Sequence, residues 1–525
     1  MNLMKRLLSF FIFHLCLVFF LNAKTWPQWR GAERNGKADK QVKISSNWPA
    51  DGPQLLWESD EIPSQDYGGF GSVIADNQLA YLSLVWHRDV PTETRTISDR
   101  VLRQIGARKI NLPRKLVEKA EKDRMSLSPR LRGSMLDEWI NNWIEQNLDK
   151  KQKLVLSDLI ASRFKKGRLA LPIDVINKLF EVKNKVFQSQ GALDDWLDNQ
   201  GFSDEIKEKV SQAVPPTRQA AEDVVIAMDL KTGKTRWKTS LDSVPTGRKS
   251  SSTPCVANGK VFAVGSERIY CLDAETGKTL WDQGLPTKEI ASSVLPFKNY
   301  VILLAGNLRA YDQKTGNLVW ENKKISGKSA SPIAWKTKQR ELILCNSSKT
   351  ISAVNPADGT LVWEGPGGGS STPTCTETHF LVHAKDEHAG LIAYELKKGR
   401  IEEAWRMPKL TRRTDSSPII HDGHAYLIGA GMRLCVEMNS GKIIRKVMAK
   451  HDISSPIMAD GKILAYEING SQLKMIEASP GNFEEIQKTK INALKCTSPA
   501  LAGTKLLIRK ESGVVCYELG KTGNP

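Results

Sequence analysis

A unit of about 40 residues recurs along most of this 525-residue chain and constrains the fold more than any other feature. It is clearest at 269–285, where two apolar runs flank the sequence Asp273-Ala-Glu-Thr-Gly277. The Asp carboxylate can accept hydrogen bonds from nearby backbone N–H groups, and glycine tolerates a positive φ. The stretch therefore predicts two strands joined by a tight turn, and Trp281 belongs to the second strand.

The turn signature returns at intervals of 39 to 44 residues. An acidic residue or Asn stands four positions before each turn glycine, and a Trp follows most of them. The glycines are Gly233, Gly277, Gly316, Gly359, Gly399, Gly441 and Gly481. A Ser-rich strand and a hairpin precede each turn, so each unit contains four short strands. Four strands in about 40 residues are typical of a β-propeller blade.

Eight Ser- or Thr-rich entry strands can be counted. Seven begin at 251, 291, 329, 370, 416, 454 and 497, and the eighth is 71–73. The last unit supplies only three strands, and the isolated Leu55-Leu56-Trp57 near the N-terminus resembles the missing fourth one. We predict an all-β fold, an eight-bladed β-propeller of four-stranded blades, closed by pairing the two ends of the chain.

The β pattern is interrupted between 88 and 221, where apolar residues follow helical spacing. Leu136, Ile140 and Trp143 are one example, and Val175, Leu179 and Val186 behind Pro172 are another. We expect an α-helical insertion at 88–221 in the first blade. It separates the start of the propeller at 24–87 from the remainder at 222–525.

Residues 1–23 have the pattern of a secretory signal peptide. Lys5 and Arg6 precede an apolar run at 7–21, and cleavage is expected after Ala23. No second long apolar run follows, so the mature chain is expected to lack a transmembrane segment and to be periplasmic or secreted. The formal net charge of +18 favours anionic surfaces such as lipid headgroups or acidic polymers, and we do not expect nucleic acid as a partner.

Seven cysteines remain beyond the signal, and three share one position in the repeat. Cys271, Cys435 and Cys516 each stand two residues before the turn acid, where other units have Ala. This pattern favours a small buried side chain over a redox or metal role, and leaves open whether any of the seven pair.

The repeat resembles the PQQ-like, quinoprotein dehydrogenase-type β-propeller repeat, most clearly at 229–237 and 273–281. Its consensus has three parts in chain order: Ser-Ser-x-Pro, then Asp-Gly-Lys-Val, then Leu-Asp-x-x-Thr-Gly-Lys-x-x-Trp. The opening Trp26-Pro-Gln-Trp29-Arg-Gly31 resembles the start of secreted bacterial proteins with this repeat. The family includes PQQ-dependent oxidoreductases and non-catalytic scaffolds such as BamB, the propeller subunit of the outer-membrane barrel-assembly machinery. The resemblance therefore implies a fold but not an activity.

The resemblance to the enzymes implies Ca²⁺ held by carboxylate and amide groups, an Asp base and commonly a disulfide between adjacent cysteines. This sequence has no adjacent Cys pair and no acidic cluster attached to an entry strand. Common hydrolase, zinc, haem and phosphate-loop motifs are also missing. We assign no catalytic, cofactor-binding or metal residue. The histidines at 379, 383, 388, 421 and 424 are interpreted as ordinary strand and turn residues.

We predict a non-catalytic scaffold that binds a protein or an anionic envelope component, with no cofactor. The alternative is a PQQ- and Ca²⁺-dependent oxidoreductase with an atypical site. Candidate binding residues precede the entry strands, at one mouth of the channel, and most are basic, although a solvated rim of scattered charges is the competing interpretation. They are Arg248, Lys249, Lys328, Arg413, Asp415, His451, Asp452 and Lys495. The helical insertion is the second candidate surface.

Overall fold

The computed structural model describes residues 25–62, 69–109, 113–246, 252–286, 291–408, 410, 415–429, 431–449 and 454–520. The expected signal at 1–23 lies outside these residues. The chain forms two compact units, Met1–His87 with Ala221–Pro525, and Arg88–Ala220. Among the described residues, no helix is both long enough and apolar enough to cross a membrane.

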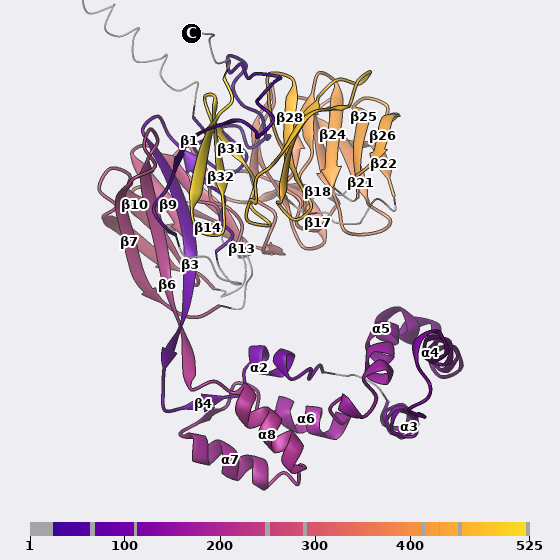
Figure 1. The fold of residues 1–525 in the computed structure, drawn as a ribbon. Helices are drawn as coiled ribbons and strands as arrows, with labels where there is room; N and C mark the ends of the chain where they lie inside the picture. The colour runs from indigo at the N-terminus through magenta and orange to yellow at the C-terminus, as the bar shows by residue number, and fades with distance from the viewer. Residues whose placement is uncertain are drawn as a thin grey trace, which may run out of the picture. The chain divides into compact units, whose positions relative to one another are not determined.

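The first unit is mostly β and consists of antiparallel sheets, most with four strands (Figure 1). The sheet around the turn at 273–277 is representative. Asp273 Oδ1 accepts hydrogen bonds from the backbone N–H and hydroxyl of Thr276, both at 2.8 Å, and Gly277 has a φ of 72°. The predicted strands and turn are therefore present. The strands are β8 (Cys255–Ala257), β9 (Lys260–Val264), β10 (Arg268–Asp273) and β11 (Thr279–Gly284).

The same order of strands recurs along the chain. Three further four-stranded sheets are β15 to β18 (Ile333–Lys336, Glu341–Asn346, Thr350–Val354, Leu361–Pro366), β19 to β22 (Thr374–Cys375, His379–His383, Leu391–Lys397, Arg400–Met407), and β23 to β26 (Ile419–His421, His424–Gly429, Met432–Glu437, Ile443–Met448). A fourth is β27 to β30 (Ile457–Ala459, Lys462–Glu467, Gln472–Glu477, Glu485–Lys490).

One sheet has three strands, β12 (Leu295–Phe297), β13 (Tyr300–Asp312) and β14 (Leu318–Gly327). Its long β13 pairs with β12 near Tyr300 and with β14 from Gly306 onward, and Gly306 has a φ of 75°. This one strand therefore supplies the pairing that two strands supply in the other sheets.

Two sheets combine segments that are distant in the sequence. One contains β2 (Ile74–Ala75), β3 (Leu79–Pro91), β6 (Thr217–Asp229) and β7 (Thr235–Ser243). The other contains β31 (Ala500–Ala502), β32 (Lys505–Arg509), β33 (Val514–Glu518) and the N-terminal β1 (Gln54–Glu58). Leu55 lies opposite Tyr517 and Trp57 opposite Cys516, so the isolated Leu-Leu-Trp sequence is the fourth strand of the last sheet, as predicted.

Tryptophans on the outer strands pack against the turn of the next sheet. Trp281 Nε1 donates to the Gln313 carbonyl at 3.1 Å, and a Cβ on Gly316 would lie 2.6 Å from the Trp281 ring. Trp57 packs on Gly233 in the same way. These turn glycines are therefore required both by their positive φ and by the close approach of an indole ring.

Two of the predicted turn glycines behave differently. The turn at Gly399 is a tight hairpin in which Lys397 pairs with Arg400, and no indole lies within 4 Å of an added Cβ there. Trp363 packs instead against Tyr394, with ring centroids 4.9 Å apart. Gly481 does not adopt a positive φ. The repeat signature therefore overstates the regularity of the later turns.

The repeated cysteine position is a tightly packed one. The Cys271, Cys435 and Cys516 side chains are fully buried, as predicted for a small apolar residue in this slot. Burial raises the pKa of Cys271 and of Cys516 to about 12. Thiols with such a pKa are poor nucleophiles near neutral pH.

The second unit is helical. It contains α2 (Asp99–Gln104), α3 (Arg114–Met125), α4 (Gly133–Asn147), α5 (Lys150–Lys166), the 3₁₀ turn η1 (Gly167–Leu169), α6 (Ile173–Glu181), α7 (Gln190–Asp198) and α8 (Asp204–Ala213). One apolar core involves α2, α6, α7 and α8, and a second involves α3, α4 and α5. The predicted helical periodicity therefore corresponds to real helices with their own cores.

The helices occupy a shorter range than the region 88–221, because strands extend into it from both ends. The long strands β3 and β6 pair with each other and extend to Pro91 and from Thr217, because sheet pairing continues past the loss of the repeat pattern. Val186, assigned to a helix by its spacing, lies in β5 (Val186–Phe187), which pairs with β4 (Arg95–Thr96). The helix α6 ends at Glu181, and Asn184 has a φ of 62°, so the chain turns before Val186.

Candidate functional site

The entry strands are joined by a closed cycle of eight hydrogen bonds. In each bond, the backbone N–H of one residue donates to the side-chain hydroxyl of the corresponding Ser or Thr on the next sheet, at 2.9 to 3.2 Å. All eight residues are buried. The cycle runs from Ser72 through Thr253, Ser293, Ser331, Thr372, Ser417, Ser455 and Ser498 back to Ser72. The Ser-rich pattern thus satisfies buried N–H groups that have no strand partner.

The segment 26–38 lies across one end of this cycle. It forms hydrogen bonds with residues in or beside the first strand of seven of the eight sheets that the cycle joins, at or just after the cycle positions. They involve Ala75, Val256, Ser293 with Val294, Pro332, Thr372, Pro418 and Met458. Because these contacts go around the closed cycle, the segment covers that end of it.

Two arginines of this segment are buried in the centre of these contacts. Arg30 and Arg34 are each 1% exposed. Arg34 donates to the carbonyls of Pro332 at 2.9 Å and Ser293 at 3.2 Å, and to that of Val294. Arg30 Nη2 donates to the Pro418 carbonyl. Backbone carbonyls, rather than carboxylates, therefore accept from both guanidinium groups.

The electrostatics of this end follow from burial. Burial lowers the pKa of Arg30 to about 9, with Arg34 lowering it further and Cys375 opposing the shift. Burial likewise lowers the pKa of Arg34 to about 9. In the part of the chain that the structure describes, no carboxylate forms an ion pair with either group. Two cations thus share one enclosed, uncompensated site.

These residues do not fit a Ca²⁺–PQQ centre at this end. A Ca²⁺ ion requires oxygen ligands, usually including carboxylates, and would be repelled by two neighbouring guanidinium groups. The described cycle offers Ser and Thr hydroxyls, each already accepting a backbone N–H.

Five of the eight predicted mouth residues lie outside the described residues, namely Arg248, Lys249, Arg413, His451 and Asp452. The other three, Lys328, Asp415 and Lys495, are exposed. Lys328, Asp415 and Lys495 each precede a cycle residue by two or three positions in the chain, whereas the residues that contact the 26–38 segment lie at or after the cycle residues. This order along the chain predicts that the three lie on the other side of the cycle from that segment. Lys495 Nζ is 5.9 Å from the centroid of the Phe70 ring.

The histidines are held by local contacts. His383 is fully buried, and its Nε2 lies 2.8 Å from the Leu410 carbonyl oxygen; burial lowers its pKa. The His379 Nδ1 lies 2.9 Å from the Thr378 hydroxyl. Within the described ranges, no three His, Cys, Asp or Glu side chains are grouped as metal ligands.

Sequence reasoning did not find the role of Arg30 and Arg34. The available signal was an aromatic-rich stretch outside the repeat, Trp26 to Trp29, directly followed by two arginines four residues apart. Such a segment needs a buried environment for its indoles, and Trp26 is 2% exposed. The acceptors of the two arginines come from different sheets, so they could not be read from local sequence.

These features define a class of mostly β proteins built from repeated antiparallel sheets, as in β-propellers. The chain belongs to the family described as outer membrane protein assembly factor BamB, whose model matches residues 221–366 and 305–523. The BamB assembly factor of Yersinia pestis is 25% identical over 325 residues, covering 56% of this chain and 79% of that protein.

Two other similarities are more distant. The tetrathionate hydrolase of Acidithiobacillus ferrooxidans is 23% identical over 268 residues, covering 46% of this chain and 52% of that protein. The crystal structure of BamB from Moraxella catarrhalis matches with a TM-score of 0.46 and 15% identity, over 57% of this chain and 90% of that one. The family match begins at residue 221, so it does not include the helical unit.

Proposed function

We propose that this chain is a non-catalytic scaffold of the cell envelope that takes part in the assembly of outer membrane proteins. Its membership of the BamB family supports this role, as does its similarity to a Yersinia pestis protein named as an outer membrane protein assembly factor. The signal pattern at 1–23 supports a periplasmic location.

The fold that carries this role is an eight-bladed propeller with a helical insertion in its first blade. The closed cycle of eight hydrogen bonds supports the count of blades, since each bond joins one entry strand to the next. Pairing of β1 with β33 supports closure by the two chain ends. The helical unit 88–220 falls between β3 and β6, which are paired neighbours in one sheet, and this supports an insertion.

The observation that carries the non-catalytic assignment is the covered end of the cycle. The segment 26–38 occupies the place where a ligand would enter from that side, and Arg30 and Arg34 hold it to three sheets. Partner contacts then fall to the opposite, mostly basic mouth and to the helical insertion. A protein or an envelope component with an acidic surface matches that charge.

Co-purification from cross-linked native envelopes tests the scaffold role. The mature chain should capture components of the barrel-assembly machinery. A variant in which 93–215 is replaced by a short Gly-rich turn keeps the base of the insertion, where Thr92 N–H donates to the Pro216 carbonyl at 3.1 Å. We expect this variant to fold and to lose the captured components. Unchanged capture would assign binding to the propeller, and no capture by the intact chain would contradict the scaffold role.

We further propose that the chain acts without PQQ. Adding PQQ and Ca²⁺ to the purified protein should give no bound quinone absorbance and no rise in the thermal midpoint. A bound quinone spectrum with a rise in the midpoint would favour the oxidoreductase alternative instead.

A further inference from the structure

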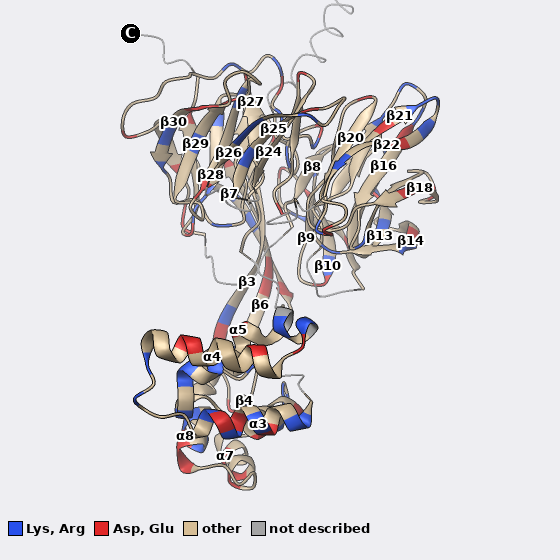
Figure 2. Cartoon of the chain, turned by 90° about the vertical axis from the view of Figure 1, so that its right-hand side faces the viewer, with Lys and Arg blue, Asp and Glu red and all other residues tan. Residues whose placement is uncertain are grey.

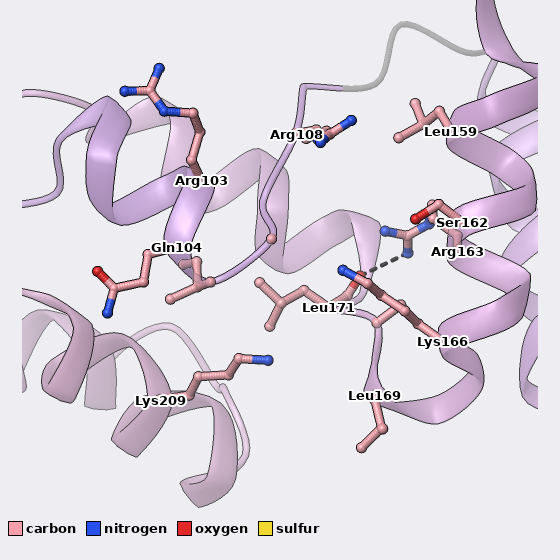
Figure 3. A pocket seen from close by; sticks show the side chains of 13 residues that line it. Arg103, Gln104, Arg108, Leu159, Ser162, Arg163, Lys166, Leu169, Leu171 and Lys209 are labelled. Atoms are coloured by element: carbon pink, nitrogen blue, oxygen red, sulfur yellow. Dashed lines mark hydrogen bonds between the residues drawn. The ribbon is translucent and has the colours of Figure 1, made fainter. Parts of the chain in front are cut away.

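The helical unit contains a pocket of about 380 Å³ that lies outside the region matched by the family model. Its walls come from α2, the segment after it, α5, η1 and α8. Figure 3 shows the lining side chains. They are Arg103, Gln104, Ile105, Gly106, Arg108, Leu159, Ser162, Arg163, Lys166, Leu169, Ala170, Leu171 and Lys209. No Asp or Glu is among them, whereas five are Lys or Arg.

Three of the five pocket cations are not neutralised by neighbouring carboxylates. Arg108, Lys166 and Lys209 form no ion pair with any carboxylate in the described part of the unit. Figure 3 shows Lys166 and Lys209 extending toward the middle of the pocket from opposite walls, while the Arg103 guanidinium is directed away from it. Lys and Arg are interspersed with Asp and Glu over the rest of the helices, so the acid-free pocket is a local feature (Figure 2).

A buried ion-pair network holds the wall of the pocket in place. Glu121 accepts from Arg124 at 2.7 Å and from Arg163 at 2.6 Å, and both arginine side chains are less than 10% exposed. Arg163 Nη2 also donates to the Leu171 carbonyl at 2.7 Å. Arg163 is therefore a positioning residue, which fixes the 167–171 segment against α5 and leaves Arg108, Lys166 and Lys209 to face a ligand.

The rim of the pocket is apolar at one point. Leu169 is 76% exposed at the end of η1, next to the exposed Arg168, and Leu159 and Leu171 continue the apolar lining inward. An exposed leucine beside several cations is a combination that suits a membrane interface, where the leucine enters the acyl boundary and the cations meet the headgroups.

We propose that this pocket binds the phosphate group of an anionic lipid headgroup at a membrane surface. Lys166, Lys209 and Arg108 would contact the phosphate oxygens, because cations without counter-ions lose least on binding an anion. The volume exceeds a single phosphate group and suits a glycerophosphate headgroup. This proposal does not rest on the scaffold role, since the pocket belongs to residues outside the family match.

Sedimentation of the full mature chain with lipid vesicles tests the proposal. The pocket variant carries Arg108→Gln, Lys166→Gln and Lys209→Gln. The control variant carries Lys115→Gln, Lys119→Gln and Arg130→Gln, which removes three exposed cations from the same unit outside the pocket. Each pocket cation should contribute about fivefold to the affinity for phosphatidylglycerol vesicles. The pocket variant should therefore bind these vesicles on the order of a hundredfold more weakly than the unchanged chain, and the control variant only about threefold more weakly. Circular dichroism and thermal midpoints verify that both variants fold.

A third variant, Leu169→Ser, separates a lipid headgroup from a free phosphate. It should weaken binding to phosphatidylglycerol vesicles about tenfold and leave the affinity for glycerol phosphate unchanged. Three results would overturn the proposal. They are equal losses in the pocket and control variants, equal binding to phosphatidylcholine vesicles, and glycerol phosphate binding without any vesicle binding that depends on the pocket. None of these results depends on whether the chain assists membrane protein assembly.

Discussion

Replacing Gly277 by Ala should destabilise the first unit far more than the same change at Gly259. Both glycines have nearly the same positive φ, 72° at Gly277 and 70° at Gly259. A Cβ at Gly277 would lie 2.5 Å from Trp237 Cε3 and 2.9 Å from Thr239 Oγ1, whereas nothing lies within 4 Å of a Cβ at Gly259. The pair of variants therefore separates backbone strain from packing between sheets.

The expected magnitudes follow from these contacts. The left-handed conformation costs an Ala residue about 1–2 kcal/mol at either position. At Gly277, overpacking against the indole adds about 1–3 kcal/mol. Displacing Trp237 also endangers its 3.0 Å hydrogen bond to the Ala274 carbonyl, worth about 1 kcal/mol. Gly277→Ala should thus cost about 2–4 kcal/mol more than Gly259→Ala.

Urea unfolding followed by tryptophan fluorescence measures this difference as a shift in the midpoint at unchanged slope. The Gly259→Ala protein supplies the reference for backbone strain alone. Equal midpoints for the two variants would refute the argument that the turn glycines are required by the indole of the preceding sheet.

Three further perturbations test other parts of the structure. Burial acts to raise the pKa of Glu121, but hydrogen bonds from two arginines lower it below its ordinary value. The stability that ionised Glu121 contributes is therefore present above the unfolded pKa of about 4.3 and is lost as the pH falls through the lower folded pKa. Glu121→Gln should reduce the stability of the helical unit by about 1–3 kcal/mol at pH 7, and the variant should no longer lose this stability in acid. Hydrogen exchange of the helical unit measures both effects. Arg34→Ala should speed amide exchange at 26–38 while the sheets keep their protection, because it removes three hydrogen bonds from the segment to the sheets and one within the segment. Trp57→Ala should cost about 3–5 kcal/mol by thermal unfolding, whereas Leu56→Ala, which trims a residue 38% exposed, should cost less than about 1 kcal/mol.

The repeat predicted much of the architecture because its determinants are local. Asp273 and Gly277 specify their turn within five residues, and the apolar alternation specifies the strands on either side. The pairing of the 55–57 strand with β33 was also predictable. The last repeat unit has only three strands of its own, and 55–57 is a strand sequence that belongs to no other unit. The Ser-rich entries were recognised as a pattern, but their hydrogen bonds join different sheets and appear only in three dimensions.

The surfaces that bear on function were harder to predict for the same reason. The acceptors of Arg34 come from residues about 260 and 298 positions away. Lys166, Lys209 and Arg108 of the pocket come from α5, α8 and the segment after α2, and they converge only through helix packing. The charged mouth residues share only their position in the repeat, which does not determine what they contact. Binding by Lys328, Asp415 and Lys495, which are exposed in the structure, stays a prediction.

The amount of folded outer-membrane β-barrel protein in cells lacking this chain tests the central claim most directly. Folded barrels are separated from unfolded ones by their heat-modifiable electrophoretic mobility. The scaffold role predicts fewer folded barrels in the deletion strain and recovery when the intact chain is restored. Unchanged levels of folded barrels in the deletion strain would contradict a role in outer membrane protein assembly.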